Sequence, residues 1–327
     1  MSGGSGEGMQ RDVYGLRIAA TGDWPEVVEA LDRDFAWFPA ATGVADASVH
    51  VRRRPPDRSG YPSSLEALRI TWRSAEYRDG GRAIVDYGRA LAVDDGTGTL
   101  TVEGEHGWTA WKAGYDFLLD RIDAHLETIG LARLNGLGLA GSQGGIVLLL
   151  PAGGGKTTLT LRALDEGVGL VSEGSPVLDA HGRLHPFPLP LLVRTTSPEA
   201  AGLPREHVRD LAGIDPDPAS LEVPAFRAAV PPGPVPLRHV VLGVRTLNGV
   251  AGLEPLPRRD VVGDLARATL VGFGVLTGGG VRSAPSRLWA TRARAVAFAR
   301  VLRGAQAWRL TLGPDKEANW RALARIV

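Results

Sequence analysis

The feature that most constrains the fold of this chain is a glycine-rich run, Pro151-Ala-Gly-Gly-Gly-Lys-Thr-Thr158, directly after the apolar stretch Ile146–Leu150. A short apolar stretch bounded by glycines predicts a buried strand, and the good helix formers of Leu159–Leu164 predict a helix after the run. A helix N-terminus that follows such a turn presents backbone N–H groups to an anion. The run therefore predicts an α/β fold with a phosphate-binding loop.

The side chains of this run match what a nucleotide phosphate chain requires. Glycines let backbone N–H groups approach the phosphates, a lysine neutralises charge on the β- and γ-phosphates, and a hydroxyl serves as a ligand of Mg²⁺. We therefore expect ATP and Mg²⁺ as cofactors, with Thr157 on the metal. The expected nucleotide-binding set is Gly153, Gly154, Gly155, Lys156, Thr157 and Thr158.

One position of the run departs from the usual phosphate-loop pattern. That pattern begins with a glycine five residues before the glycine that precedes the lysine, and here the position holds Leu150. The loop is therefore degenerate, and an ordinary glycine-rich turn between a strand and a helix is the alternative interpretation. Glycine is abundant in this chain, with 43 residues.

Composition limits the classes of function that the chain can serve. The formal net charge is +1, so we expect neither nucleic acid nor a membrane surface as a general partner. The absence of cysteine excludes thiol catalysis, disulfides and cysteine-ligated zinc, and is typical of a cytoplasmic protein. No apolar segment reaches the length of a membrane span. The sequence leaves open whether the chain forms a homo-oligomer.

The pattern of elements predicts two domains after a flexible N-terminus at residues 1–12. Residues 13–128 alternate short strands with glycine-containing turns and end in a helix over 113–129, which predicts a smaller α+β domain. Residues 129–327 form the expected nucleotide-binding domain. Its later part predicts long loops over 198–236 and, further on, a strand at 238–244, a helix at 286–303, a strand at 307–312 and a last helix at 316–326.

The segment Gly130–Arg194 resembles a known family of kinases. It contains the strand and loop Ile146–Thr158, then Val168-Gly-Leu-Val-Ser-Glu-Gly-Ser-Pro-Val-Leu-Asp179, then the proline-rich stretch Pro186–Pro190. This order is similar to the HPr kinase/phosphorylase-like proteins, whose P-loop kinase domain shares its fold with phosphoenolpyruvate carboxykinase. It looks most like the HPr-kinase-related proteins that accompany ribosomally made, modified peptides. The resemblance implies an ATP- and Mg²⁺-dependent phosphotransferase whose acceptor is a protein or peptide side chain.

Two further positions depart from the pattern of that family. Its strand after the phosphate-loop helix ends in two acidic residues, which hold Mg²⁺ and help to deprotonate the acceptor; this chain has Glu173 followed by Gly174. A histidine of the family, in the strand before the loop, corresponds to Asn135. The resemblance therefore implies Lys156 and Glu173 as catalytic residues and Glu173 as a metal ligand. A solvated charge at a strand end is the alternative for Glu173.

Two hypotheses of function follow from this combination. The first is a working kinase of a protein or peptide side chain, with Lys156 on the phosphates and Glu173 as metal ligand or base. The second is a nucleotide-binding pseudokinase that recruits a peptide or protein, because three positions of the expected site differ from the family pattern. Elsewhere in the chain, His181 and His185 are interpreted as ordinary surface histidines.

Overall fold

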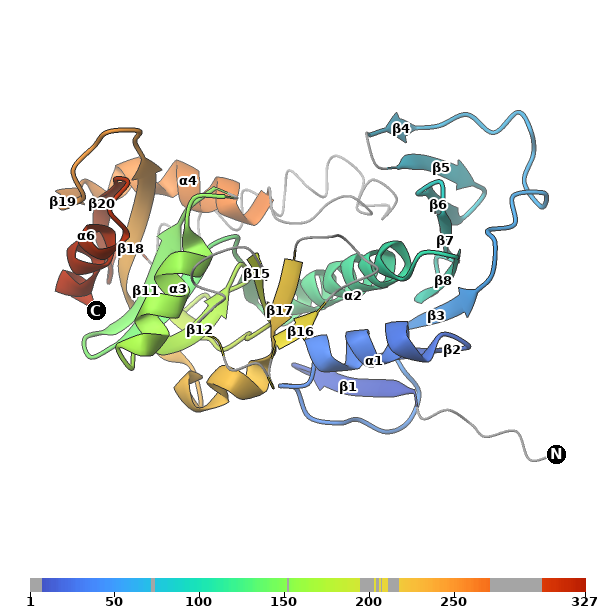
Figure 1. The fold of residues 1–327 in the computed structure, drawn as a ribbon, viewed down its shortest axis with the longest axis horizontal. Coiled ribbons are helices and arrows are strands. Elements are labelled where there is room, and N and C mark those ends of the chain that lie inside the picture. Colours follow the sequence, from blue (N-terminus) through green and yellow to red (C-terminus); the bar gives the residue numbers. More distant parts are fainter. Residues whose placement is uncertain are drawn as a thin grey trace. The chain divides into compact units, whose positions relative to one another are not determined.

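The computed structural model describes residues 8–71, 74–151, 153–194, 203, 206, 208–210, 218–270 and 302–327. Within these residues the chain is mixed α/β, with several mixed sheets and few helices. It divides into two compact units (Figure 1). The first contains the chain up to His125, and the second contains the described residues from Leu126 onward, apart from Asp210 and Pro218.

The first unit is built on an eight-stranded sheet of order β1-β2-β3-β8-β7-β6-β5-β4. Strands β2, β3 and β8 are parallel to one another, and the remaining neighbours are antiparallel. The elements are β1 (Met9–Val13), β2 (Leu16–Gly22), α1 (Pro25–Asp34), β3 (Ala47–Arg53), β4 (Arg69–Ile70), β5 (Ala75–Asp79), β6 (Arg82–Asp86), β7 (Ala90–Asp94), β8 (Thr99–Gly104) and α2 (Gly107–Thr128).

Alternation along the strands explains how this sheet acquires two different faces. Along β8, Leu100 and Val102 are fully buried whereas Thr101 and Glu103 on the opposite face are partly exposed. The buried face packs against α2, where Gly114 lies so close to Val49 of β3 that a Cβ atom would come within 3.1 Å of it. The opposite face consists of polar and apolar side chains of mixed exposure.

The N-terminus is ordered from an earlier position than the sequence indicates. Residues 9–12 belong to the expected flexible segment, yet they form most of β1, which pairs with β2 from Met9↔Ala20 to Val13↔Leu16. Burial of Met9 and Val13 against the core accounts for this order. The first seven residues lie outside the described part of the chain.

The second unit contains a nine-stranded sheet whose main order is β12-β10-β11-β18-β14-β13-β9, with β20 on β18 and β19 on β20. The central strands β11, β18 and β20 are parallel. The strands of this sheet are β9 (Leu131–Arg133), β10 (Leu137–Gly141), β11 (Gly144–Leu149), β12 (Gly169–Glu173), β13 (Val177–Asp179), β14 (Arg183–His185), β18 (Val235–Arg245), β19 (Gly252–Leu256) and β20 (Gln306–Leu312).

Helices and a second, smaller sheet complete this unit. The helices are α3 (Lys156–Asp165), α4 (Arg258–Leu270) and α6 (Lys316–Leu323), with 3-10 helices at Val223–Ala229 and Ala324–Ile326. The strands β15 (Leu191–Arg194), β16 (Val208–Asp210) and β17 (Pro218–Leu221) form a three-stranded sheet of order β15-β17-β16. The core between α4 and the large sheet includes Val147, Val240, Val261 and Leu265, all fully buried.

The sequence predicts the ends of this unit better than its middle. The expected strand at 307–312 and helix at 316–326 correspond to β20 and to α6 with its 3-10 extension. The expected loop region 198–236 instead contains described residues of β16 and β17 and a 3-10 helix. Most of the helix expected at 286–303 lies outside the described residues.

Candidate functional site

The glycine-rich run joins β11 to α3 as a strand, a tight turn and a helix. The strand ends at Leu149, and Gly155 is the N-cap of α3. Gly153 and Gly155 have φ values of 72° and 99°, in the left-handed region that favours glycine. A Cβ atom on Gly154 would lie 2.9 Å from the carbonyl oxygen of Pro151. All three glycines are therefore required by the backbone geometry of this turn.

Leu150, which replaces the first glycine of the usual pattern, has a packing role in this fold. Its side chain is 4% exposed and lies over Gly243 of β18, where a Cβ atom would come within 2.2 Å of Leu150 Cδ2. It also approaches Gly154 of the turn, where a Cβ atom would lie 3.3 Å from Leu150 Cβ. The leucine thus anchors the start of the loop in the core at a place where the neighbouring strand has no side chain.

Lys156 begins α3, and its ammonium group lies against the start of its own loop. Nζ donates to the carbonyl oxygens of Leu150 and Pro151, at 2.9 and 3.1 Å. Burial lowers the pKa of this ammonium group, while the negative charge of Glu173 acts in the opposite direction. The lysine is therefore held at the loop by weak acceptors, which an anionic ligand can replace with stronger, charge-assisted hydrogen bonds.

Thr157 and Glu173 are brought together by the packing of α3 beside β12. The Thr157 hydroxyl donates to Glu173 Oε1 at 2.5 Å, although the two residues lie 16 positions apart in the chain. The other carboxylate oxygen, Oε2, is shielded from solvent and has no hydrogen-bond partner in the described structure. Burial raises the pKa of the Glu173 carboxyl, against the effects of the Thr157 hydrogen bond, of the nearby Thr160 hydroxyl and of the Lys156 charge.

These two side chains fit a Mg²⁺ site of the kind expected at a phosphate-binding loop. Mg²⁺ prefers oxygen ligands and is usually held by one or two carboxylates together with substrate phosphates and water. Thr157 and Glu173 supply a hydroxyl and a carboxylate in direct contact, and Oε2 of Glu173 is a buried acceptor without a partner. Glu173 is partly buried, and its Oε2 is shielded from solvent.

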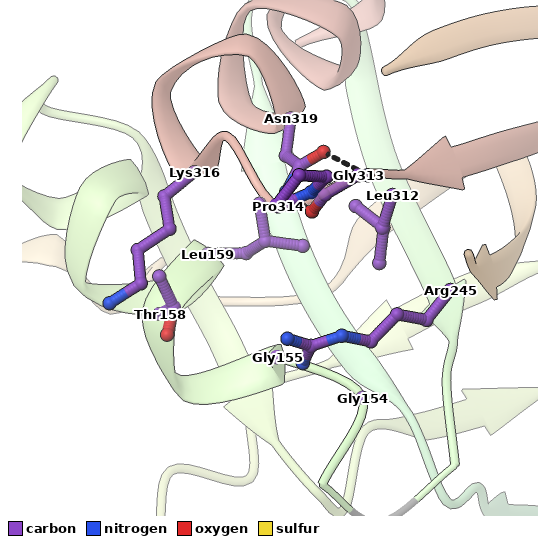
Figure 2. A pocket seen from close by; sticks show the side chains of 10 residues that line it. All are labelled: Gly154, Gly155, Thr158, Leu159, Arg245, Leu312, Gly313, Pro314, Lys316 and Asn319. Atoms are coloured by element: carbon purple, nitrogen blue, oxygen red, sulfur yellow. Dashed lines mark hydrogen bonds between the residues drawn. The ribbon is translucent and has the colours of Figure 1, made fainter. Parts of the chain in front are cut away.

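A small pocket lies beside the first turn of α3 (Figure 2). It is lined by Gly154, Gly155 and Thr158 from the loop and helix, and by Arg245 and Lys316 from β18 and α6. Its volume is about 60 Å³, far below the roughly 300–1,000 Å³ of pockets that enclose drug-sized ligands. As it stands, the pocket has room for a group of about phosphate size.

The two cations at this pocket were not identified from the sequence. Arg245 ends β18, and its Nη1 lies 3.5 Å from the carbonyl oxygen of Gly153. Lys316 is the first residue of α6, and together with Lys156 it accounts for two of the chain's three lysines. Only the parallel pairing of β18 with β11 and the packing of α6 on α3 bring them to the loop. No local motif marks either residue.

The wall of the pocket opposite the loop is rigidly built. Asn319 is 8% exposed, accepts a hydrogen bond from the Gly313 amide at 2.8 Å and donates one to the Gly313 carbonyl at 3.0 Å, as Figure 2 shows in part. Asp315 caps α6 by accepting from the amides of Glu317 and Ala318. The turn that carries Lys316 is therefore held in place by its own side chains.

The two other departures from the family pattern lie near Glu173. Gly174 has a φ of 83°, and its amide donates to the carbonyl oxygen of Gly136 at 2.7 Å. A Cβ atom on Gly174 would have no neighbour within 4 Å. Asn135, next to Gly136, lies between β9 and β10, and its backbone amide donates to the carbonyl oxygen of Ala268. The space beside Glu173 that a second carboxylate would fill is therefore open.

Among the other residues singled out from the sequence, His185 has a more specific environment than a surface histidine. Its Nε2 lies 3.0 Å from Oδ2 of Asp179, and the side chain is 15% exposed. Asp179 also binds the Arg183 guanidinium and the backbone amides of His181 and Arg183. This network fixes the hairpin between β13 and β14.

Among the described residues, no group of three or more histidine, aspartate or glutamate side chains is placed to hold a metal ion. No helix in the described part of the chain is both long and apolar enough to span a membrane. The sequence matches no protein-family model, and no curated protein matches it at a significant level.

Proposed function

We propose that this chain binds MgATP at the loop before α3 and transfers the γ-phosphoryl group to a side chain of a protein or peptide. The observation that carries the proposal is the contact between Thr157 and Glu173 at the start of α3, next to three glycines and Lys156. Phosphoryl transfer requires mainly positioning and charge neutralisation, and these residues supply both. The fold we propose for the second unit is accordingly a P-loop kinase domain of the HPr kinase and phosphoenolpyruvate carboxykinase type.

Each residue of the site has a defined role in this proposal. Lys156 exchanges the carbonyl oxygens of its own loop for phosphate oxygens, and the amides of the glycine turn bind the same phosphates. Thr157 and Glu173 hold Mg²⁺, which when bound neutralises charge on the phosphates. Arg245 and Lys316 provide two further positive charges beside the turn. The site is thus strongly cationic relative to a chain whose net charge is +1.

Among the residues of the proposed site, Glu173 alone has a carboxylate that can accept a proton. Because burial raises its pKa, it is a better proton acceptor than an exposed glutamate would be. In the proposed reaction the acceptor hydroxyl loses its proton to Glu173, its oxygen forms a bond to the γ-phosphorus, and the bond to the β,γ-bridging oxygen breaks. A carboxylate that also ligates the metal accepts this proton less readily. We therefore expect slow turnover.

The assay for the proposal is transfer of label from γ-labelled ATP to candidate peptides in the presence of Mg²⁺. The first acceptors to test are precursors of modified peptides that are encoded beside the gene. We expect label on a serine, threonine or other hydroxyl side chain. The transfer should require Mg²⁺ and should occur at the ATP concentrations found in cells. If MgATP does not bind, the proposal as a whole is wrong.

A pseudokinase is the second candidate, and Gly174 is the observation that favours it. The position that would hold a second carboxylate has no side chain, and the pocket beside the loop holds only a phosphate-sized volume. Such a protein would bind MgATP and become more stable in its presence, by an amount that grows with ligand concentration, but would transfer no label. In that case nucleotide binding would serve to recruit a peptide or protein.

The variant Gly174→Asp distinguishes the two candidates. Aspartate tolerates the left-handed backbone better than most residues, and a Cβ atom meets no neighbour at this position, so we expect the variant to fold. If the protein is a pseudokinase, the new carboxylate should produce label transfer that the wild type lacks. Gly174→Asn is the matched control, with the same shape and no charge. Measurable transfer by the wild type, at a rate equal to that of Gly174→Asp, would contradict the pseudokinase.

A further inference from the structure

A second cavity lies in the first unit, on the face of the eight-stranded sheet opposite α2. Its floor consists of the cross-strand pairs Leu91↔Glu103 and Val93↔Thr101 of β7 and β8. Its volume is about 290 Å³, close to the lower end of the roughly 300–1,000 Å³ found for small-molecule sites. It is therefore larger than the pocket beside α3, and none of its lining residues belongs to the phosphate loop.

The segment after β3 forms the roof of this cavity and is fastened at two points. Arg54 forms an ion pair with Glu103, which is 13% exposed, and the Asp57 amide donates to the other oxygen of the same carboxylate. Arg58 binds both oxygens of Asp86, each at 2.7 Å. Bidentate arginine–carboxylate pairs are the most specific of ion pairs. These ion pairs hold the segment after β3 over the sheet, and the cavity lies between the segment and the sheet.

Two carboxylates line the cavity, and both accept hydrogen bonds from the protein; Asp57 accepts from the amide and the hydroxyl of Ser59. Glu103 is fully engaged by Arg54, Arg52 and the Asp57 amide. Arg82, which also lines the cavity, forms no ion pair with any described residue. Desolvation is the largest effect on the pKa of the Tyr61 hydroxyl and raises it; the charge of Arg82 lowers this pKa, and the carboxylates of Glu103, Asp79 and Asp57 raise it. Arg82 and Tyr61 are therefore two donors that line one cavity, whose floor combines the apolar side chains of Leu91 and Val93 with Thr101 and Glu103.

We propose that this cavity binds a carboxylate attached to an apolar group, with the carboxylate on Arg82 and Tyr61 and the apolar group on Leu91 and Val93. A planar guanidinium beside a hydroxyl donor is well suited to the two oxygens of a carboxylate. The volume admits an apolar group no larger than about one aromatic ring. The ligand is either a free acid or the C-terminus of a peptide. This site does not depend on the function proposed for the phosphate loop.

The test is calorimetric titration of the full chain, without nucleotide, by N-acetyl-L-phenylalanine and by its uncharged amide. We expect the acid to bind at least about tenfold more tightly than the amide, because only the acid makes a charge-assisted hydrogen bond to Arg82. The tripeptide Gly-Gly-Phe, with and without C-terminal amidation, distinguishes the two sources. A peptide C-terminus as the natural ligand predicts that the tripeptide acid binds more tightly than the acetylated amino acid.

Variants connect this preference to the cavity. Arg82→Gln should remove the preference for the acid, and Tyr61→Phe should reduce it several-fold. Arg89→Gln, an equal change of charge at an exposed residue of the same unit outside the cavity lining, should leave it unchanged. Thermal unfolding of each variant checks that the sheet is intact. Equal binding of acid and amide by the wild type, failure of both to bind, or an unchanged preference in Arg82→Gln would each overturn the proposal.

Discussion

Replacement of Lys156 by alanine is expected to weaken MgATP binding by roughly 10- to 100-fold and to abolish transfer of label. A hydrogen bond to a charged group is worth about 1.5–3 kcal/mol, and 1.4 kcal/mol corresponds to a factor of ten in affinity. Lys156 would make such bonds to the phosphates, because its ammonium group already lies at the loop beside Leu150 and Pro151. Titration with MgATP measures the affinity, and γ-labelled ATP measures the transfer.

The control for this change is Lys112→Ala. Lys112 is also a helical lysine, but it lies in the first unit and is paired with Asp116 in the same helix. The control variant should bind MgATP as the wild type does. The affinity of Lys156→Ala must be compared at equal folded fraction, since removal of the lysine also leaves two carbonyl groups of the loop without this donor. Wild-type affinity in a folded Lys156→Ala would mean that the loop is only a structural turn.

Replacement of Glu173 by glutamine is expected to lower label transfer by at least about 100-fold, the usual effect of removing a general base. Glutamine keeps the shape of the side chain and can still accept a hydrogen bond from the Thr157 hydroxyl, so the loop should remain in place. The loss of a negative metal ligand should also raise the Mg²⁺ concentration required for nucleotide binding. Transfer is therefore measured over a series of Mg²⁺ concentrations.

The same variant has an expected signature in the pH dependence of stability. Burial raises the folded-state pKa of Glu173 above its ordinary value of 4.5, so the unfolded chain releases this proton at a lower pH than the folded chain. The contribution of the group to stability is complete below pH 4.5 and is lost as the pH rises through the folded-state pKa. The Glu173→Gln variant has no carboxyl to ionise at this position, so its stability does not fall for this reason. The free energy of unfolding of the wild type should therefore fall relative to that of the variant as the pH rises from 4.5.

Glu166→Gln serves as the control for both measurements. Glu166 is the C-cap of α3, is exposed and pairs with Arg162, so the change removes a carboxylate at the end of this helix that is opposite the site. Its transfer rate should match that of the wild type, and its pH profile of stability should be nearly parallel to the wild-type curve. Unchanged transfer in Glu173→Gln would assign proton removal to another group or to the substrate itself.

The sequence predicts the parts of the site that depend on local structure. An apolar strand, three glycines and a helix are neighbours in the chain, so their pattern specifies the turn and places Lys156 and Thr157 at the helix start. Glu173 follows shortly afterwards on β12, which packs beside α3, and the structure brings it into contact with Thr157. The expected α/β class is confirmed at this coarse level, whereas the kinase type of the fold remains a prediction.

Residues contributed by distant strands could not be predicted in the same way. Arg245 reaches the loop only because β18 pairs in parallel with β11, and the register of a pairing between strands so far apart has no local signature. The cavity of the first unit has the same origin. Arg82 and Tyr61 line the same cavity because of the order of the sheet and the ion pairs of the loop after β3, neither of which an alternating pattern specifies.

The packing of Leu150 on Gly243 has a consequence for comparing this chain with more typical phosphate loops. The side chain of Leu150 fills the space that a side chain at position 243 of β18 would need. A substitution at one of these two positions therefore changes what the other can accommodate. A chain that acquires glycine at position 150 gains room for a side chain at position 243, and one that acquires a side chain at 243 must lose the leucine. The two positions should therefore covary. A glycine on a distant strand, rather than one in the loop, is the mark by which chains with this arrangement can be found.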